Sequence, residues 1–303
     1  MARSCVAVGA CALALAVVHR ADPATGPVAH WKFDEGRGAI ANDSSGYGNT
    51  GTIFGGATWT RGVAGAAIRL DGIDDYVNCG NGAVLNPALE MSISAWFRGT
   101  QAFSGSGNDA IVDKGYVSHR PPYYQYHLGV TGTLYPNDAG AAQFTTSGAV
   151  GAGTQANAWV VGQWYHFVAT TGASGTNFYV DGELIQHNPN APAPMTDFGK
   201  PLLIGKFANL PFYLPCDIDD VQVYDRSLSC AEVQFLFSNP GLETTSGGAA
   251  VFADLDADGH VSASDLAIML GAWGDCAACP SDLDCSGTVD ANDLAILLGA
   301  WTG

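Results

Sequence analysis

The clearest structural pattern of this 303-residue chain lies in Trp164-Tyr-His-Phe-Val-Ala169 and, a few residues later, in Asn177-Phe-Tyr-Val180-Asp-Gly-Glu-Leu184. In both runs aromatic and apolar side chains alternate with others in a period of two, which is typical of a β-strand with one buried face. The Asp-Gly pair at 181–182 suits the primed turns that join two antiparallel strands. The stretch therefore predicts β-structure that closes in a hairpin.

The same pattern recurs between Gly, Asn, Asp and Pro clusters from Val28 to about Asn239, where no helix of ordinary length is apparent. The other alternating runs are His30-Trp-Lys-Phe33, Ala67-Ile-Arg-Leu70, Ser92-Ile-Ser-Ala-Trp-Phe97, Leu202-Leu-Ile204 and Asp219-Asp-Val-Gln-Val-Tyr224. Short strands at regular spacing favour an antiparallel sandwich or jelly roll. The fold class predicted for this part is mainly β.

Six strings then occur in a fixed order. They are Trp31-Lys-Phe-Asp-Glu-Gly36, Asp43-Ser-Ser-Gly-Tyr-Gly-Asn49, Leu70-Asp-Gly-Ile-Asp-Asp-Tyr76, Gln163-Trp-Tyr-His-Phe-Val168, Tyr179-Val-Asp-Gly-Glu183 and Ile218-Asp-Asp-Val-Gln-Val-Tyr224-Asp-Arg-Ser-Leu-Ser229. As an ordered set they resemble a laminin G-like domain of the concanavalin A-type lectin and glucanase superfamily, over residues 28–239. The resemblance implies an antiparallel jelly-roll β-sandwich that ends in a strand and a short helix, and that binds carbohydrate or an extracellular protein.

Many members of that family hold a structural calcium ion, and the resemblance places one near Asp34, Asp43 and Asp219. The alternative is that these carboxylates cap turns through side-chain hydrogen bonds to nearby backbone N–H groups.

A ligand contact is predicted at Arg120, Tyr123, Tyr124 and Tyr126, which lie together in an aromatic run. Tyrosines beside an arginine can stack on sugar rings and bind their hydroxyl groups. The alternative is a strand with one buried aromatic face.

The last fifty residues contain one motif twice. Asp254-Leu-Asp-Ala-Asp-Gly-His-Val-Ser-Ala-Ser-Asp265 precedes Leu-Ala-Ile-Met-Leu-Gly-Ala-Trp273, and Asp282-Leu-Asp-Cys-Ser-Gly-Thr-Val-Asp-Ala-Asn-Asp293 precedes Leu-Ala-Ile-Leu-Leu-Gly-Ala-Trp301. The copies are 28 residues apart and identical at 14 of 20 positions. A repeat of fixed period indicates a repeated structural unit.

Each copy begins with a twelve-residue loop like that of an EF-hand. Such a loop offers oxygen ligands to calcium from positions 1, 3, 5, 7, 9 and 12 and turns at a glycine in position 6. The predicted calcium ligands are Asp254, Asp256, Asp258, the carbonyl of His260, Ser262 and Asp265 in the first loop, and Asp282, Asp284, Ser286, the carbonyl of Thr288, Asp290 and Asp293 in the second. Gly259 and Gly287 occupy the turns. Calcium is therefore the expected cofactor.

One short apolar helix is predicted after each loop, and no helical pattern precedes either loop. This arrangement resembles a type I dockerin, over residues 251–303. The resemblance implies a calcium-dependent anchor that docks onto a cohesin-like domain or another docking protein, with loop positions 10 and 11 (Ala263, Ser264, Ala291 and Asn292) facing the partner. Typical dockerins lack cysteines between the repeats, so this chain departs from the pattern.

The composition of the chain limits the cell compartments and the classes of partner that are expected. The formal net charge is −17 with only 12 Lys and Arg residues, which disfavours nucleic acid and anionic membranes as partners. Residues 1–21 are interpreted as a signal peptide, because a positive start precedes an apolar run too short to span a membrane. The prediction is a secreted or cell-surface protein without a membrane span.

Six cysteines follow the predicted signal peptide, and export favours disulfides over a zinc site. Cys79, Cys216 and Cys230 lie in the large domain, whereas Cys276, Cys279 and Cys285 lie in the repeat region. Pairing within each domain alone leaves one odd thiol in each, and spacing does not decide the connectivity.

No catalytic residues are predicted. Glucanases of this fold use two neighbouring carboxylates, whereas this chain has five Glu, none within ten residues of another. Asp219 and Asp220 are adjacent, so strand alternation predicts that they face opposite sides.

Residues 240–250 are predicted to be a linker between the two domains. The function expected is non-catalytic binding of carbohydrate or extracellular protein by an anchored protein. The alternatives are a dockerin-borne glycoside hydrolase or other carbohydrate-active enzyme, and a structural cell-surface protein.

Overall fold

The computed structural model describes residues 26–101, 108–115, 124–131, 140–147, 151–154, 158–190, 192–208, 210–245, 253–256, 258–276 and 279–302. The predicted signal peptide, Arg120 and Tyr123 lie outside the described residues.

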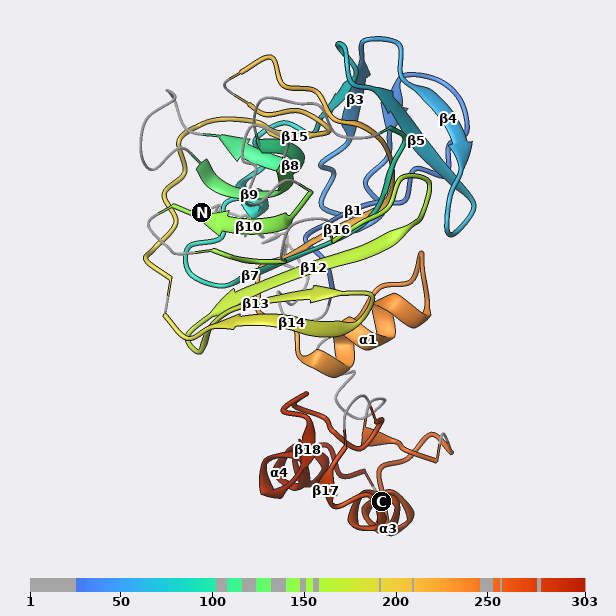
Figure 1. The fold of residues 1–303 in the computed structure, drawn as a ribbon, viewed down its shortest axis with the longest axis vertical. Coiled ribbons are helices and arrows are strands. Elements are labelled where there is room, and N and C mark those ends of the chain that lie inside the picture. The colour runs from blue at the N-terminus through green and yellow to red at the C-terminus, as the bar shows by residue number, and fades with distance from the viewer. Residues whose placement is uncertain are drawn as a thin grey trace, which may run out of the picture.

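Two antiparallel sheets form the large domain (Figure 1). The first has the order β14 (Glu183–Asn188), β13 (Gly175–Val180), β12 (Tyr165–Gly172), β7 (Met91–Gly99), β16 (Pro215–Tyr224), β5 (Ala66–Asp71) and β4 (Thr58–Arg61), with β1 (Ala29–Trp31) also paired to β16. The second has the order β11 (Ala152–Gly153), β10 (Ala142–Thr146), β9 (Tyr124–Thr131), β8 (Asn108–Gly115), β15 (Leu202–Ile204), β6 (Tyr76–Asn78), β3 (Gly51–Phe54) and β2 (Ile40–Ala41). A 3₁₀ turn, η1 (Ala83–Leu85), precedes β7.

The core lies between the two sheets. In β12 the alternating residues Tyr165, Phe167 and Ala169 belong to this core, as the sequence pattern predicts. The hairpin at β13 and β14 is also confirmed: Asp181 and Gly182 have φ angles of 51° and 82°, and positive values at both central residues characterise the type I′ turn. The mainly β, antiparallel sandwich is thus confirmed.

Helix α1 (Cys230–Ser238) covers the outer face of the first sheet. Its residues Val233 and Leu236 belong to a second apolar cluster with Val168, Tyr179 and Tyr224. Ser229 and Glu232 form a capping box that satisfies N–H groups at its start. The predicted closing strand and short helix are both present.

The first part of the predicted linker is attached to the sandwich. Gly241 N donates to Asp220 Oδ2 at 2.8 Å, and Thr244 N donates to the Tyr224 hydroxyl at 3.3 Å. Glu243 Oε1 lies 2.7 Å from His30 Nδ1. This segment therefore leaves the large domain in a fixed position.

The C-terminal repeats form a small helical unit next to α1 (Figure 1). It contains α3 (Ala263–Gly271), α4 (Ala291–Gly299) and a two-stranded ladder of β17 (Gly274–Asp275) and β18 (Thr288–Val289). Its apolar cluster includes Val261, Met269, Leu283, Val289 and Leu297. The predicted helix after each loop is confirmed.

A disulfide joins the two units, between Cys230 at the start of α1 and Cys285 in the second loop. A second disulfide joins Cys276 and Cys279, while Cys79 and Cys216 are free, buried thiols. The cross-domain bridge accounts for the odd number of cysteines in each region. Among the described residues no helix has the length and apolar character needed to cross a membrane.

Candidate calcium loops and ligand groove

Both predicted calcium loops bring three carboxylates together. In the first loop one oxygen each from Asp254, Asp256 and Asp258 lies within 4.8 Å of the others. In the second loop the converging residues are Asp282, Asp284 and Asp293. Clustered hard oxygen donors suit calcium, and the donor sets therefore fit the predicted ion.

The hydrogen bonds within the loops are duplicated. Gly259 N donates to Asp254 Oδ2 at 2.8 Å, and Gly287 N donates to Asp282 Oδ2 at 2.9 Å. The backbone N–H at position 5 of each loop donates to the carboxylates at positions 1 and 3. Equivalent residues in the two repeats therefore have equivalent local geometry.

Positions 9 and 12 have a role that the sequence analysis missed. Ser262 and Asp290 are the N-caps of α3 and α4, and each forms a capping box with Asp265 or Asp293 three residues later. The same residues that are predicted to hold calcium thus also begin the helices. The sequence signal for this role is a capping residue followed by an acidic residue three positions later, which is the spacing of a capping box.

The remaining predicted calcium ligands and the predicted partner-facing residues lie within the loops or at the helix starts. The Ser286 hydroxyl donates to the Thr288 carbonyl at 2.9 Å, so two predicted ligands are in contact. His260 is exposed in the first loop. The predicted partner-facing residues are the first two residues of each helix and are all exposed, namely Ala263, Ser264, Ala291 and Asn292.

Both helices also expose large apolar side chains at matching positions. Leu270 and Leu298 are 52% and 51% exposed, and Trp273 and Trp301 are 49% and 39% exposed. Ile268 and Ile296 follow the same pattern. Repeated exposure of this kind is typical of a surface that contacts another macromolecule.

The surroundings of the loops differ. At loop position 1, Asp282 is 4% exposed whereas Asp254 is half-buried, and at position 3, Asp284 is half-buried whereas Asp256 is exposed. Burial, followed by the charges of Asp293 and Asp284, raises the pKa of the Asp282 carboxyl despite hydrogen bonds from Gly287 N and Ser286 N. Bringing these carboxylates together without a cation is therefore unfavourable.

The three carboxylates predicted to hold an ion in the large domain do not form one cluster. Among the described residues, Asp34, Asp43 and Asp219 are not a group whose ligand atoms lie within 4.8 Å of one another. Asp43 accepts N–H bonds from His30, Ser45 and Asn49, which lower its pKa although burial raises it. Asp43 is therefore a turn-capping residue, and the predicted three-carboxylate site is corrected.

Asp34 and Asp219 hold the same loop. Asp219 Oδ2 accepts from Val63 N at 2.9 Å, and Asp34 Oδ1 accepts from Ala66 N at 2.9 Å. Burial raises the pKa of Asp219 to about 7, with smaller contributions from Asp220 and Asp34. Asp219 Oδ1 is buried without a hydrogen-bond partner among the described residues.

A bulge in β16 overturns the predicted opposite orientation of Asp219 and Asp220. The register shifts between Asp219 and Gln222, and Asp220 has a φ of 48°. Both aspartates lie between Ile218 and Val221, which belong to the core. The extra residue therefore keeps both carboxylates out of the core.

Buried polar groups around this bulge form a network absent from the sequence predictions. His30 is fully buried, with Nε2 2.5 Å from Asp220 Oδ1. Burial lowers the pKa of His30, but hydrogen bonds and charges of Asp220 and Glu243 raise it above its ordinary value. Gln222 Nε2 also donates to Asp220 Oδ1, at 3.1 Å.

A groove of about 410 Å³ lies over β9, β10 and β11 at one end of the second sheet. The polar residues that line it are Thr131, Gln143, Thr145, Thr154 and Gln186, and Tyr124 contributes an aromatic ring. Thr131 Oγ1 is bonded to the Ala141 backbone, Thr154 Oγ1 accepts from Ala142 N at 2.8 Å, and Gln186 Oε1 accepts from Gly153 N at 2.6 Å. The outward residues Gln143 and Thr145 of β10 alternate with the buried residues Ala142 and Phe144. No carboxylate is among the described residues that line the groove.

The predicted ligand-binding tyrosines have different environments. Tyr124 lines the groove, and its ring stacks on His127 with a centroid distance of 4.7 Å. Tyr126 is fully buried and donates its hydroxyl to the Leu85 carbonyl at 2.9 Å. Tyr126 is therefore a core residue, which corrects that part of the prediction in favour of a buried aromatic face.

His127 holds Tyr124 in place and is itself held by Asp113. His127 Nδ1 lies 2.9 Å from Asp113 Oδ1, and Asp113 Oδ2 accepts from Ala208 N at 2.8 Å. Phe207 packs edge-on against both Tyr124 and His127. Asp113 is not recognisable from sequence patterns, because its pairing with His127 depends on the register of β8 and β9.

Three glutamates have structural partners. Glu35 accepts from Asn42, Glu232 pairs with Arg226 and Glu243 contacts His30. None of the five glutamates lines the groove.

Comparisons with solved structures agree with the sandwich. Domain 4 of AbnA, a GH43 extracellular arabinanase from Geobacillus stearothermophilus, in complex with arabinotriose, is 18% identical with a TM-score of 0.53, over 70% of this chain and 98% of that one. The binding domain of Paraclostridial Mosquitocidal Protein 1 is 14% identical with a TM-score of 0.54, over 70% and 52%. The receptor binding domain of botulinum neurotoxin C/D mosaic serotype is 12% identical with a TM-score of 0.52, over 70% and 51%. The chain thus spans about half the length of these two toxin domains.

No curated protein matches the chain. The family model of the concanavalin A-like lectin/glucanases superfamily matches residues 71–234, which is more than half of the chain and runs from the end of β5 into α1. The chain therefore belongs to the concanavalin A-like lectin/glucanases superfamily.

Proposed function

We propose that this chain is an exported, non-catalytic binding protein whose sandwich recognises an oligosaccharide and whose C-terminal repeats anchor it through calcium. The disulfides and the lectin-like fold fit an extracellular protein. The observation that carries the proposal is the groove over β9–β11, where Tyr124 and several amide and hydroxyl side chains converge without a carboxylate among its described residues.

The chemistry of the groove favours a sugar. The Gln143 amide, the Gln186 amide nitrogen and the Thr145 hydroxyl offer groups that match ring hydroxyl groups, and a tyrosine ring offers an apolar face for C–H groups. A volume of about 410 Å³ suits a short oligosaccharide more than a protein surface. Since an arabinanase domain of this fold has been solved with arabinotriose, arabino-oligosaccharides are a reasoned first probe.

Non-catalytic binding is proposed because hydrolysis by this fold needs an acid and a second carboxylate at the ligand. No aspartate or glutamate lines the described part of the groove. Asp113, which lies under the neighbouring aromatic cluster, has both oxygens engaged by His127 and Ala208 N. It is therefore proposed to be structural.

The anchoring part rests on the repeats. Calcium held by the two loops would neutralise the clustered carboxylates and fix each loop to the start of its helix. Ala263, Ser264, Ala291 and Asn292, with the exposed apolar residues of α3 and α4, are proposed to contact a cohesin-like partner. For the large domain we propose a structural calcium at Asp34 and Asp219 only, where Asp219 Oδ1 is a free buried acceptor among the described residues.

The recognition proposal is tested by titrating the intact chain with a panel of oligosaccharides that includes arabinotriose. Tyr124→Ala should weaken binding about tenfold or more, because stacking and adjacent contacts each contribute about 1 kcal/mol. Tyr47→Ala is the matched control, since Tyr47 is 40% exposed and does not line the groove. Equal affinities for both variants would overturn the assignment of the groove.

The anchoring proposal is tested by passing the intact chain over immobilised cohesin domains. Binding in calcium that is lost in chelator is the expected result. Binding that persists in chelator, or no binding to any cohesin tested, would oppose a dockerin-like role.

A further inference from the structure

The two predicted calcium loops are identical at seven of twelve positions but have different neighbours. The second loop packs against α1 and the β13–β14 hairpin, around a cavity of about 230 Å³. Its walls include Gly182, Glu183, Gln234, Asp282 and Cys285. In the first loop the equivalent residue of Asp282, Asp254, is half-buried, and Asp256 is exposed.

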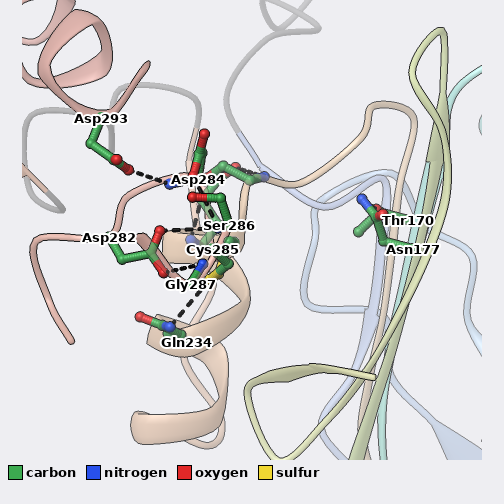
Figure 2. Close-up of a disulfide and its surroundings, with 12 residues drawn as sticks. Thr170, Asn177, Gln234, Asp282, Asp284, Cys285, Ser286, Gly287 and Asp293 are labelled. Atoms are coloured by element: carbon green, nitrogen blue, oxygen red, sulfur yellow. Dashed lines mark hydrogen bonds between the residues drawn. A yellow bond between two sulfur atoms is a disulfide. The ribbon is translucent and has the colours of Figure 1, made fainter. Parts of the chain in front are cut away.

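The disulfide joins α1 to a loop residue that lies between two predicted calcium ligands. Cys285 occupies loop position 4, between the predicted ligands Asp284 and Ser286, and its sulfur is bonded to Cys230. Gln234 lies one helical turn after Cys230 and donates to Cys285 Sγ at 3.4 Å (Figure 2). Two side chains on one face of α1 therefore hold a single residue of the loop.

Helix α1 is a rigid support for this bond. Ser229 and Glu232 cap its first turn, and Arg226 pairs with Glu232 at 2.6 Å. Val233 and Leu236 are fully buried against the sheet. Movement of Cys285 relative to the sandwich would therefore require α1 to leave its packing.

The opposite side of the same segment is also held. Gly287 O accepts from Cys276 N at 2.9 Å, and the following residues Thr288–Val289 pair with Gly274–Asp275. The backbone from Cys285 to Gly287 includes the N–H groups that bind both Asp282 oxygens, as Figure 2 shows. The ligand-bearing turn is thus fixed from two sides.

This restraint opposes an electrostatic tendency to open. Oxygens of Asp282, Asp284 and Asp293 lie within 4.8 Å of one another, and like charges at that distance repel. A loop without restraint relieves the repulsion by spreading, and calcium must then order it again. A loop already held in its binding form avoids that cost and binds more tightly.

We propose that the Cys230–Cys285 disulfide is a positioning element for the second calcium loop, which makes the two sites unequal and the affinity of the second site dependent on the oxidation of this bond. The inference rests on the proposed calcium binding. It assigns Cys285 and Cys230 a role toward the ion although neither is a ligand. The first loop has no disulfide among its described residues and serves as an internal reference.

The test is calorimetric calcium titration of the intact, metal-stripped chain in two backgrounds. Asp256→Asn disables the first loop and reports the second site alone, whereas Asp284→Asn reports the first site alone. Each background is measured with and without the double change Cys230→Ser and Cys285→Ser. The double change should weaken the second site about tenfold or more, a loss of about 1.4 kcal/mol, and leave the first site within about twofold.

Equal weakening of both sites, or no weakening of the second, would overturn the positioning role. Retained affinity of the first site, with unchanged far-ultraviolet circular dichroism, shows that the serine variants are folded. A further arm uses mild reductant on the chain with Cys276→Ser and Cys279→Ser, where loss of affinity only at the second site supports the proposal. If the unaltered chain binds no calcium at all, both the proposed anchor and this inference are wrong. If the chain binds calcium with the same affinity with and without the disulfide, only this inference is wrong.

Discussion

The replacement His30→Ala tests how the sandwich holds the segment that leads to the calcium loops. His30 is fully buried, and its two ring nitrogens lie 2.5 Å from Asp220 Oδ1 and 2.7 Å from Glu243 Oε1. Removing the imidazole leaves Asp220, which is 2% exposed, without its histidine partner. Breaking a buried pair from one side costs about 3–5 kcal/mol of unfolding free energy.

Two observations place the loss within that range. Asp220 keeps hydrogen bonds from Gln222 Nε2 and Gly241 N, which favours the lower end. Glu243 is about one-third exposed, so loss of its contact adds little. The expected loss is therefore about 3 kcal/mol, measured by urea denaturation of the intact chain followed by circular dichroism.

The loss should also depend on pH. Because the folded-state pKa of His30 is raised, its contribution is complete below the unfolded value and is lost as pH rises through the folded value. The difference between the unaltered chain and His30→Ala should therefore be larger at pH 6 than at pH 9.

His187→Ala is the control, because His187 is exposed on β14 and its Nδ1 is hydrogen-bonded to Asn177 Oδ1 at 2.7 Å, near the surface. It should change stability by less than about 0.5 kcal/mol. A loss below about 1 kcal/mol for His30→Ala, or a loss that grows with pH, would show that His30 does not stabilise the folded chain through Asp220.

Three other changes have defined outcomes. In chelator, Asp256→Asn should raise the melting temperature of the C-terminal unit, since two charges 4.8 Å apart repel by about 0.9 kcal/mol in water. With calcium, the same change should lower the melting temperature, because it removes a ligand. Scanning calorimetry measures both shifts, and shifts in the same direction would contradict the calcium role. Asp219 has a pKa raised to about 7, so in chelator the free energy of unfolding should fall as the pH rises from 4 to 7, by at most about 4 kcal/mol. Urea denaturation of Asp219→Asn should show no such fall, and a fall that persists in this variant would exclude Asp219 as its source. Tyr126→Phe should cost about 1 kcal/mol through the lost bond to Leu85 and leave oligosaccharide affinity unchanged in titration, whereas weaker binding would return Tyr126 to the ligand site.

Local sequence patterns predicted the elements that depend on neighbouring residues. The alternation at Tyr165–Ala169 and the turn at Asp181–Gly182 arise from pleat and backbone twist, so they are visible without tertiary information. The convergence of carboxylates in each Asp-rich loop is also local, because residues of one twelve-residue segment supply them.

The features that were missed depend on register and on distant contacts. One extra residue in β16 reverses the expected side of Asp220, and alternation alone does not reveal a bulge. Tyr126 and Tyr124 are only two residues apart, yet the irregular pairing of β8 with β9 gives them different environments. The Cys230–Cys285 bond spans 55 residues, and cysteine parity indicates that a cross-domain pair is possible without identifying it.

Native mass spectrometry of the intact chain with the tightest oligosaccharide found tests whether the groove over β9–β11 binds a sugar without cleaving it. We expect one ligand of unchanged mass on the unaltered chain, reduced occupancy on Tyr124→Ala, and only intact oligosaccharide in solution after prolonged incubation. Shortened oligosaccharides that accumulate with the unaltered chain, or equal occupancy on Tyr124→Ala, would contradict the account.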